Sequence, residues 1–155
     1  MDSLEGKKAP AFTLEGSDGK THSIKDYLGK RVVIYFYPRD NTPGCTKESC
    51  GFRDLNQDIG DLNTVVLGVS KDSLASHDKF IEKFNLPFTL LSDPETKMMQ
   101  KYGAWGEKVL YGKTSIGCIR STVIVDEKGK IIKHWKKVTK AEAHPAKVLE
   151  VLESL

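Results

Sequence analysis

The sequence predicts an α/β fold in which helices cover a mixed β-sheet. Apolar runs rich in β-branched residues alternate with amphipathic helical segments along the chain. The interior runs are apolar on both faces, as expected for strands buried inside an α/β sheet. The last two strand-like runs are joined by a short glycine turn, which adds an antiparallel pair and makes the sheet mixed.

The first half of the chain begins with an expected N-terminal β-hairpin, in which Asp18-Gly19 forms the turn between strands at 11–14 and 21–24. The remaining expected elements of this half are a buried strand at 31–37, a turn-rich loop at 39–44, a helix from about 45 to 56 and a second buried strand at 64–70. Gly51 and Gly60 are expected to weaken the helix.

The second half repeats the alternation and ends in a hairpin and a helix. Asp72-Ser73 is expected to cap a helix whose apolar positions are Phe80, Ile81 and Phe84. Residues 105–117 have no clear period, and we expect a long loop there. The other expected elements are a strand at 88–91, a helix from 93 to 102, a hairpin of strands at 121–126 and 130–135, and a helix at 141–155.

Length and composition narrow the class of protein. The 155 residues are expected to form one domain, 1–155, and 39% hydrophobic with 29% charged residues is typical of a globular protein. Lys and Arg number 24 against 21 Asp and Glu, without a basic block, so nucleic acid is not an expected partner. No apolar run approaches the ~20 residues that cross a bilayer, and the N-terminus lacks the apolar stretch of a signal peptide. We therefore expect a cytoplasmic protein that does not bind membranes.

The three cysteines are an odd number, which fits badly with a fully paired extracellular framework. Cys45 follows a strand and a loop rich in proline and glycine, at the expected first turn of a helix. Free backbone amides and the helix dipole favour a thiolate there. Thr42 is close enough for its hydroxyl to reach the sulfur, and Pro38 and Pro43 stiffen the loop. The alternative is that Thr42 caps the helix and Cys45 is a small buried apolar residue.

Cys50 lies five residues after Cys45. On an ideal helix the Cα atoms of such a pair are about 8–9 Å apart, whereas a disulfide usually needs ~7 Å or less. The two thiols can therefore join only if the first turns of the helix unwind, and Gly51 is expected to make unwinding easier. The alternative is that Cys50 is a core residue.

Other uses of the thiols are less well supported. The Cys45-x4-Cys50 spacing differs from the Cys-x-x-Cys of thioredoxin-type active sites and zinc sites. The four histidines are scattered through the sequence, and no glycine-rich nucleotide-binding loop is present. We therefore expect neither a metal nor a cofactor.

The segment 37–50, Tyr-Pro-Arg-Asp-Asn-Thr-Pro-Gly-Cys-Thr-Lys-Glu-Ser-Cys, resembles the Pro-x-x-x-Thr-x-x-Cys motif of peroxiredoxins. Segments 88–93, 105–108 and 120–122 are similar to the bacterioferritin comigratory protein branch of this AhpC/TSA-like family, also called peroxiredoxin Q. The resemblance runs nearly end to end. It implies a three-layer α/β/α thioredoxin-like fold and, commonly, a monomer.

The resemblance also implies roles for individual residues. Cys45 corresponds to the peroxidatic cysteine that attacks a hydroperoxide, and Cys50 to the resolving cysteine that forms an intramolecular disulfide. Thr42 corresponds to the hydroxyl that bonds thiolate and peroxide, Arg120 to the arginine that helps ionise the sulfur, and Pro38 to the proline that shields the pocket. Arg120 and Thr122 are expected to share one face of a strand.

The resulting hypothesis is an atypical 2-Cys thiol peroxidase that reduces hydrogen peroxide and organic hydroperoxides and is itself reduced by thioredoxin or a similar dithiol. The alternative is a redox sensor switched by closure of a Cys45–Cys50 disulfide. Cys118 stands where relatives are expected to carry an aliphatic residue. Strand alternation predicts it on the same face as Arg120, where it is either a buried apolar residue or a competing resolving thiol.

Overall fold

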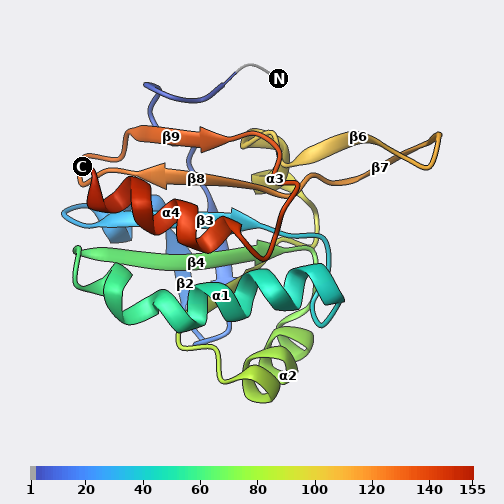
Figure 1. Ribbon diagram of the computed structural model, residues 1–155, viewed down its shortest axis with the longest axis horizontal. Helices are drawn as coiled ribbons and strands as arrows, with labels where there is room; N and C mark the ends of the chain where they lie inside the picture. Colours follow the sequence, from blue (N-terminus) through green and yellow to red (C-terminus); the bar gives the residue numbers. More distant parts are fainter. Residues whose placement is uncertain (1–2) are drawn as a thin grey trace.

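The computed structural model describes residues 3–155 and contains a seven-stranded mixed sheet (Figure 1). The strand order across this sheet is β2-β1-β5-β4-β3-β8-β9, and β6 and β7 form a separate two-stranded hairpin. The strands are β1 Thr13–Gly16, β2 Thr21–Ser23, β3 Arg31–Phe36, β4 Thr64–Ser70, β5 Thr89–Ser92, β6 Trp105–Leu110, β7 Lys113–Cys118, β8 Ser121–Val125 and β9 Ile131–Trp135.

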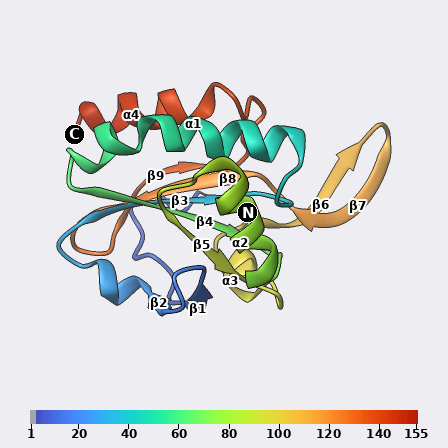
Figure 2. The same cartoon turned by 90° about the horizontal axis from the view of Figure 1, so that it is seen from below.

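Helices lie on both sides of the sheet, which gives the three-layer α/β/α fold that the family resemblance implies. Figure 2 shows α1 and α4 side by side above the sheet, with α3 and the short 3-10 helix η1 on the opposite side. Among the described residues, no helix has both the length and the apolar character needed to cross a membrane. The helices are η1 Ile24–Tyr27, α1 Pro43–Gly60, α2 Leu74–Phe84, α3 Lys97–Lys101 and α4 His144–Glu153.

The central strand β3 explains how the sheet is built. It pairs in parallel with β4 and antiparallel with β8, and the antiparallel register places Phe36 opposite Ser121. Because β3 is covered on both faces, the residues that follow Arg31 are buried, and their side chains alternate between two cores. Val32, Ile34 and Phe36 pack with α3 and the N-terminal segment. Val33, Tyr35 and Tyr37 pack with α1 and α4.

Most of the expected elements are present. The N-terminal hairpin pairs β1 with β2, and Gly19 in its turn has a φ of 79°. Ser73 caps α2 by accepting a hydrogen bond from the Ser76 amide. Helix α1 is longer than expected, because it passes through Gly51 and continues to Gly60.

The prediction of a long loop at 105–117 is wrong. Strands β6 and β7 form an antiparallel hairpin that projects from the body of the protein (Figure 1). Its turn is Tyr111-Gly112, with φ values of 53° and 76°. Val109 and Ile116 are exposed, so the hairpin lacks the alternation of buried and exposed side chains by which a strand is recognised in a sequence.

Candidate active site

The candidate site lies where β3 ends and α1 begins. Pro43 is the first residue of α1, and Cys45 is the third. The Cys45 side chain packs into the core between the sheet and α1 and is only 1% exposed. The first amides of a helix have no partner within the helix and carry a partial positive charge. The fold therefore places this thiol where an anion is favoured.

Arg120 reaches Cys45 from the opposite side of the site. Its Nη2 atom donates a hydrogen bond of 3.2 Å to Cys45 Sγ, although the two residues are 75 positions apart. The pairing of Phe36 with Ser121 brings them together, because residue 120 then lies beside the end of β3. Gly44 leaves room for the guanidinium, since a Cβ atom there would lie 3.2 Å from Nη2. The expectation that Arg120 shares a face with Thr122 agrees with this geometry, because Thr122 also faces the α4 side.

A buried carboxyl group, that of Glu48, binds the other terminal nitrogen of the Arg120 guanidinium. Arg120 Nη1 donates to Glu48 Oε1 at 2.7 Å, while Glu48 Oε2 is buried with no hydrogen-bond partner among the described residues. Burial raises the pKa of Glu48 to about 7, against the opposing attraction of Arg120. Burial alone would lower the pKa of Arg120, but Glu48 and Cys45 raise it above its usual value. Glu48 lies one helical turn after Cys45, and nothing in its local sequence marks it as a site residue.

Thr42 and Pro38 lie in the loop that precedes α1. Thr42 occupies the N-cap position, but its hydroxyl donates to the Arg39 carbonyl at 2.9 Å and makes no capping bond. Neither the expected contact with the sulfur nor the alternative of a side-chain cap is present. Pro38 directly follows the buried Tyr37 and is half-buried. Of the predicted residues, the fold thus brings only Arg120 into hydrogen-bond contact with Cys45.

A second buried polar cluster anchors the same loop to α2. Asp40 accepts hydrogen bonds from the Tyr37 hydroxyl at 2.6 Å and the Ser76 hydroxyl at 2.8 Å, and it contacts His77 Nδ1 at 2.7 Å. His77 is fully buried, and its Nε2 donates to the Leu91 carbonyl at 2.9 Å. Both ring nitrogens therefore lie against oxygen atoms, one of a carboxyl group and one of a backbone carbonyl. Asp40 lies 36 residues before Ser76 and 37 before His77, so no local pattern in the sequence groups these side chains.

The same cluster is the one group of metal-ligating side chains found among residues 3–155. Asp40, Asp72 and His77 each offer an atom within 4.8 Å of the others. These atoms are already engaged within the protein, since Asp72 Oδ2 accepts from the Asp40 amide and the Ser70 hydroxyl. These hydrogen bonds explain the cluster as an anchor of the loop that precedes α1.

Comparison with known proteins decides the family. The AhpC/TSA family model matches residues 5–134. Peroxiredoxin Bcp of Bacillus subtilis is 46% identical over 150 residues, which cover 97% of this chain and 95% of the relative. The chain belongs to the peroxiredoxin family.

Solved structures agree with this assignment. A mutant of Xylella fastidiosa PrxQ superimposes with a TM-score of 0.91 at 32% identity, over 99% of this chain and 98% of the other. The Xanthomonas campestris bacterioferritin comigratory protein, described for its alkyl peroxide reduction activity, gives 0.86 at 36% identity, over 92% and 90%. This peroxiredoxin is therefore a thiol peroxidase that takes hydroperoxide and a thiol reductant, and the alternative of a redox sensor is not favoured.

Cys50 of this peroxiredoxin lies on the same continuous helix as Cys45. Both are free thiols, and Cys50 is partly exposed. The glycine that follows it has a packing role that the sequence did not reveal. A Cβ atom on Gly51 would lie 2.7 Å from Pro145 Cγ, so this glycine permits the close approach of α1 and α4.

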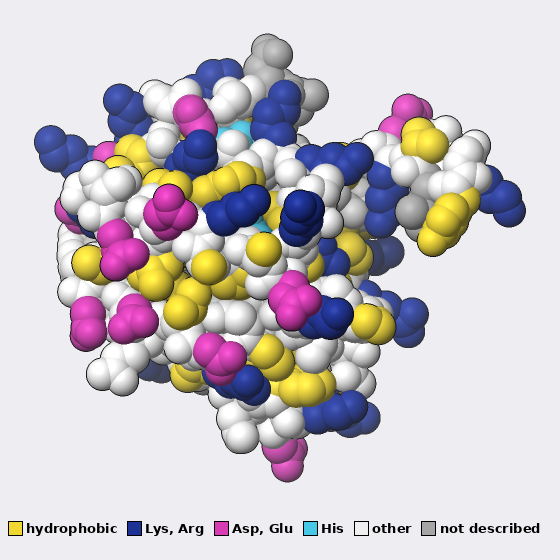
Figure 3. Space-filling view, viewed as in Figure 1, with side chains coloured by type: hydrophobic (Ala, Val, Ile, Leu, Met, Phe, Trp, Pro, Cys, Tyr) yellow, Lys and Arg dark blue, Asp and Glu magenta, His cyan; other side chains and the backbone are white. Residues whose placement is uncertain are grey.

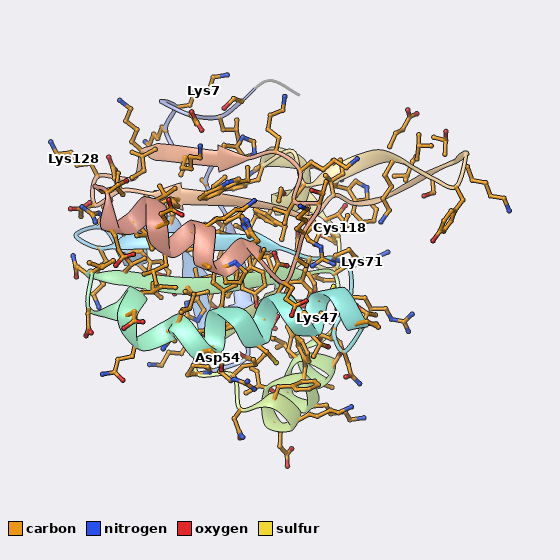
Figure 4. The ribbon with its side chains drawn as sticks, in the orientation of Figure 1. Lys7, Lys47, Asp54, Lys71, Cys118 and Lys128 are labelled. Atoms are coloured by element: carbon orange, nitrogen blue, oxygen red, sulfur yellow. The ribbon has the colours of Figure 1, made fainter. Side chains whose placement is uncertain are left out.

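The prediction that Cys118 shares a face with Arg120 is wrong. Cys118 ends β7 at the base of the hairpin (Figure 4) and packs in the core on the α3 side, whereas Cys45 packs on the α1 side. The alternation fails because the chain leaves one sheet at Cys118 and enters the other at Ser121, with the Ile119 amide bonded to Ala104. Burial raises the pKa of Cys118 to about 12, which leaves it a poor nucleophile at neutral pH.

Proposed function

We propose that this peroxiredoxin reduces hydrogen peroxide and organic hydroperoxides through Cys45 and forms an intramolecular disulfide with Cys50. The observation that carries the proposal is the hydrogen bond from Arg120 Nη2 to Cys45 Sγ at the first turn of α1. Hydrogen bonds from a charged donor are about twice as strong as neutral ones. The same guanidinium is close enough to stabilise the negative charge that develops when the O–O bond breaks.

The first step forms one bond and breaks another. The Cys45 thiolate attacks the terminal peroxide oxygen, an S–O bond forms, and the O–O bond breaks. The leaving alkoxide or hydroxide takes up a proton and departs as alcohol or water. The sulfur is oxidised to a sulfenic acid and the peroxide is reduced, so this step requires no metal or cofactor.

In the second step the Cys50 thiolate attacks the Cys45 sulfur, and the S–O bond breaks with release of water. The continuous helix opposes this step, because residues five positions apart are too distant for a disulfide. Unwinding must break the Glu48 bond to Arg120 and the Ser49 bond to Tyr35, which is 2.8 Å long. These contacts favour the folded helix while the thiols are reduced. Thioredoxin or a similar dithiol then reduces the disulfide.

Three cysteine variants test this mechanism in a peroxide assay coupled to thioredoxin, thioredoxin reductase and NADPH. Cys45→Ser should abolish peroxide consumption. Cys50→Ser should still form the sulfenic acid, trapped with dimedone, but lose sustained turnover with thioredoxin. Cys118→Ser is the matched control and should retain turnover.

The resolving role is tested separately by non-reducing peptide mapping of the peroxide-treated protein. A Cys45–Cys50 linkage is expected. A Cys45–Cys118 linkage, or full activity in Cys45→Ser, would show that the thiols are assigned wrongly.

A further inference from the structure

Positive charge is concentrated around the start of α4. Residues 130–147 contain six lysines and one acidic residue, a net charge of +5 in a chain whose total is +3. Five of these lysines form a surface that we call the lysine face, and within residues 3–155 no carboxylate lies within ion-pair distance of them. Figure 3 shows Lys and Arg side chains over the end of β9 and the start of α4. The lysine face consists of Lys133, Lys136, Lys137, Lys140 and Lys147.

The lysine face borders the redox centre. The Val138 amide donates to the Arg120 carbonyl at 2.7 Å, which ties the segment before α4 to the residue directly before β8. A hollow of about 530 Å³ separates residues 139–143 from Gly44 and Lys47 at the start of α1. Lys47 is labelled on α1 in Figure 4. A protein that brings its dithiol to the first turns of α1 therefore meets Lys140 at this hollow, next to the exposed ion pair of Lys47 with Glu142.

A smaller hollow of about 100 Å³ lies at the N-terminal end of α4, lined by Lys137, Lys140 and Lys147 together with Trp135 and His144. Ala143 at the N-cap has no side-chain acceptor, and no acidic residue occupies the first turn. A helix start of this kind favours an anion.

One side chain that lines this hollow has a ring nitrogen without a hydrogen-bond partner among the described residues. Only 3% of the His144 surface is exposed, and its Nε2 atom forms a hydrogen bond of 2.8 Å with Thr122 Oγ1. Its Nδ1 has no hydrogen-bond partner among the described residues, and the residue lines the hollow. Three cationic side chains, an uncapped helix start and a free imidazole nitrogen together fit one carboxylate group.

We propose that the lysine face is the docking surface for an acidic dithiol protein, which seats one carboxylate side chain in the hollow at the start of α4. This inference rests on the proposed function, because it concerns the reductant of the Cys45–Cys50 disulfide. Opposite charges on two partners raise association rates by roughly 10- to 1,000-fold, and salt suppresses the effect. Hydrogen peroxide is uncharged, so its reaction with Cys45 gains nothing from this surface.

Two charge-reversal variants with equal net charge test the docking surface. Lys137→Glu/Lys140→Glu alters the lysine face, and Lys25→Glu/Lys30→Glu alters exposed lysines near η1, on the other side of the sheet. Each variant lowers the net charge from +3 by four. With an acidic bacterial thioredoxin as the probe, kcat/KM for thioredoxin should fall about tenfold in the first variant and less than about twofold in the second. Turnover with dithiothreitol, a small neutral dithiol, should stay unchanged in both.

A second measurement reports on occupation of the hollow at the start of α4. In NMR titrations of the reduced enzyme with thioredoxin, the imidazole signals of His144 should shift and those of His22 should not. Equal kcat/KM for thioredoxin in the two variants, or a His144 signal that does not respond, would overturn the docking surface. Loss of peroxide consumption with dithiothreitol in the unmodified protein would instead overturn the proposed function.

Discussion

Replacing Glu48 with glutamine tests the electrostatics of the site. The pKa of Glu48 is raised from 4.5 to about 7, chiefly by burial. The folded state therefore binds the Glu48 proton more tightly than the unfolded chain does. The stabilisation that this proton provides is fully present below about pH 4.5 and is lost as the pH rises through about 7. Glutamine has nearly the same shape, keeps an oxygen for Arg120 Nη1 and does not ionise.

The size of the expected change in unfolding free energy follows from the shift in the pKa of Glu48. One pKa unit corresponds to 1.36 kcal/mol, so raising the pKa from 4.5 to about 7 corresponds to about 3 kcal/mol. Between about pH 5 and about pH 8 the unmodified protein should lose up to about 3 kcal/mol of unfolding free energy that Glu48→Gln retains. The variant should be close to the unmodified protein at the lower pH and more stable at the higher one.

Urea denaturation followed by circular dichroism at the two pH values measures this difference. His144 acts in the opposite direction, because burial lowers its pKa to about 4 and its contribution is lost as the pH falls. That contribution is common to both proteins and cancels when they are compared at each pH. Glu150→Gln, an exposed change on α4, is the control and should show no pH-dependent difference. If Glu48→Gln differs from the unmodified protein equally at both pH values, the assignment of a raised pKa to Glu48 is wrong.

Three further predictions concern the arginine, the helix contact and the loop anchor. Arg120→Met should slow Cys45 oxidation by about 10²- to 10³-fold in stopped-flow measurements, because it removes the donor to the sulfur; an unchanged rate would contradict its role. In thermal melts, Gly51→Ala should destabilise the protein by about 1–3 kcal/mol, because its Cβ atom clashes with α4. Gly60→Ala is the control, and it should be neutral or stabilising because the space around Gly60 is open. His77→Phe should cost about 3–5 kcal/mol by leaving Asp40 without its buried partner. Asp40→Asn should cost much less, because an amide at this position can still hydrogen-bond the imidazole, and equal losses in these two variants would refute the role of this hydrogen bond as the anchor.

Local patterns in the sequence were sufficient for most of the fold. The continuous β-branched runs became β3 and β4, and the Pro-Gly pair before Cys45 marked the start of α1. These features depend on residues that are close in the chain, so periodicity and turn chemistry report them directly. The β6–β7 hairpin was missed because it packs against little of the protein and so has no buried face to shape its sequence.

Local sequence patterns place Cys45 at a helix start after a buried strand, with Cys50 too far along the same helix to reach it. The surroundings of the sulfur depend on contacts between distant segments. Arg120 reaches Cys45 through the antiparallel register of β3 and β8, and it divides its hydrogen bonds between that thiol and Glu48. Cys118 lies on the other side of the sheet because the chain changes sheets between residues 118 and 121. Strand pairing joins residues far apart in the chain, and no local pattern specifies which strands will pair.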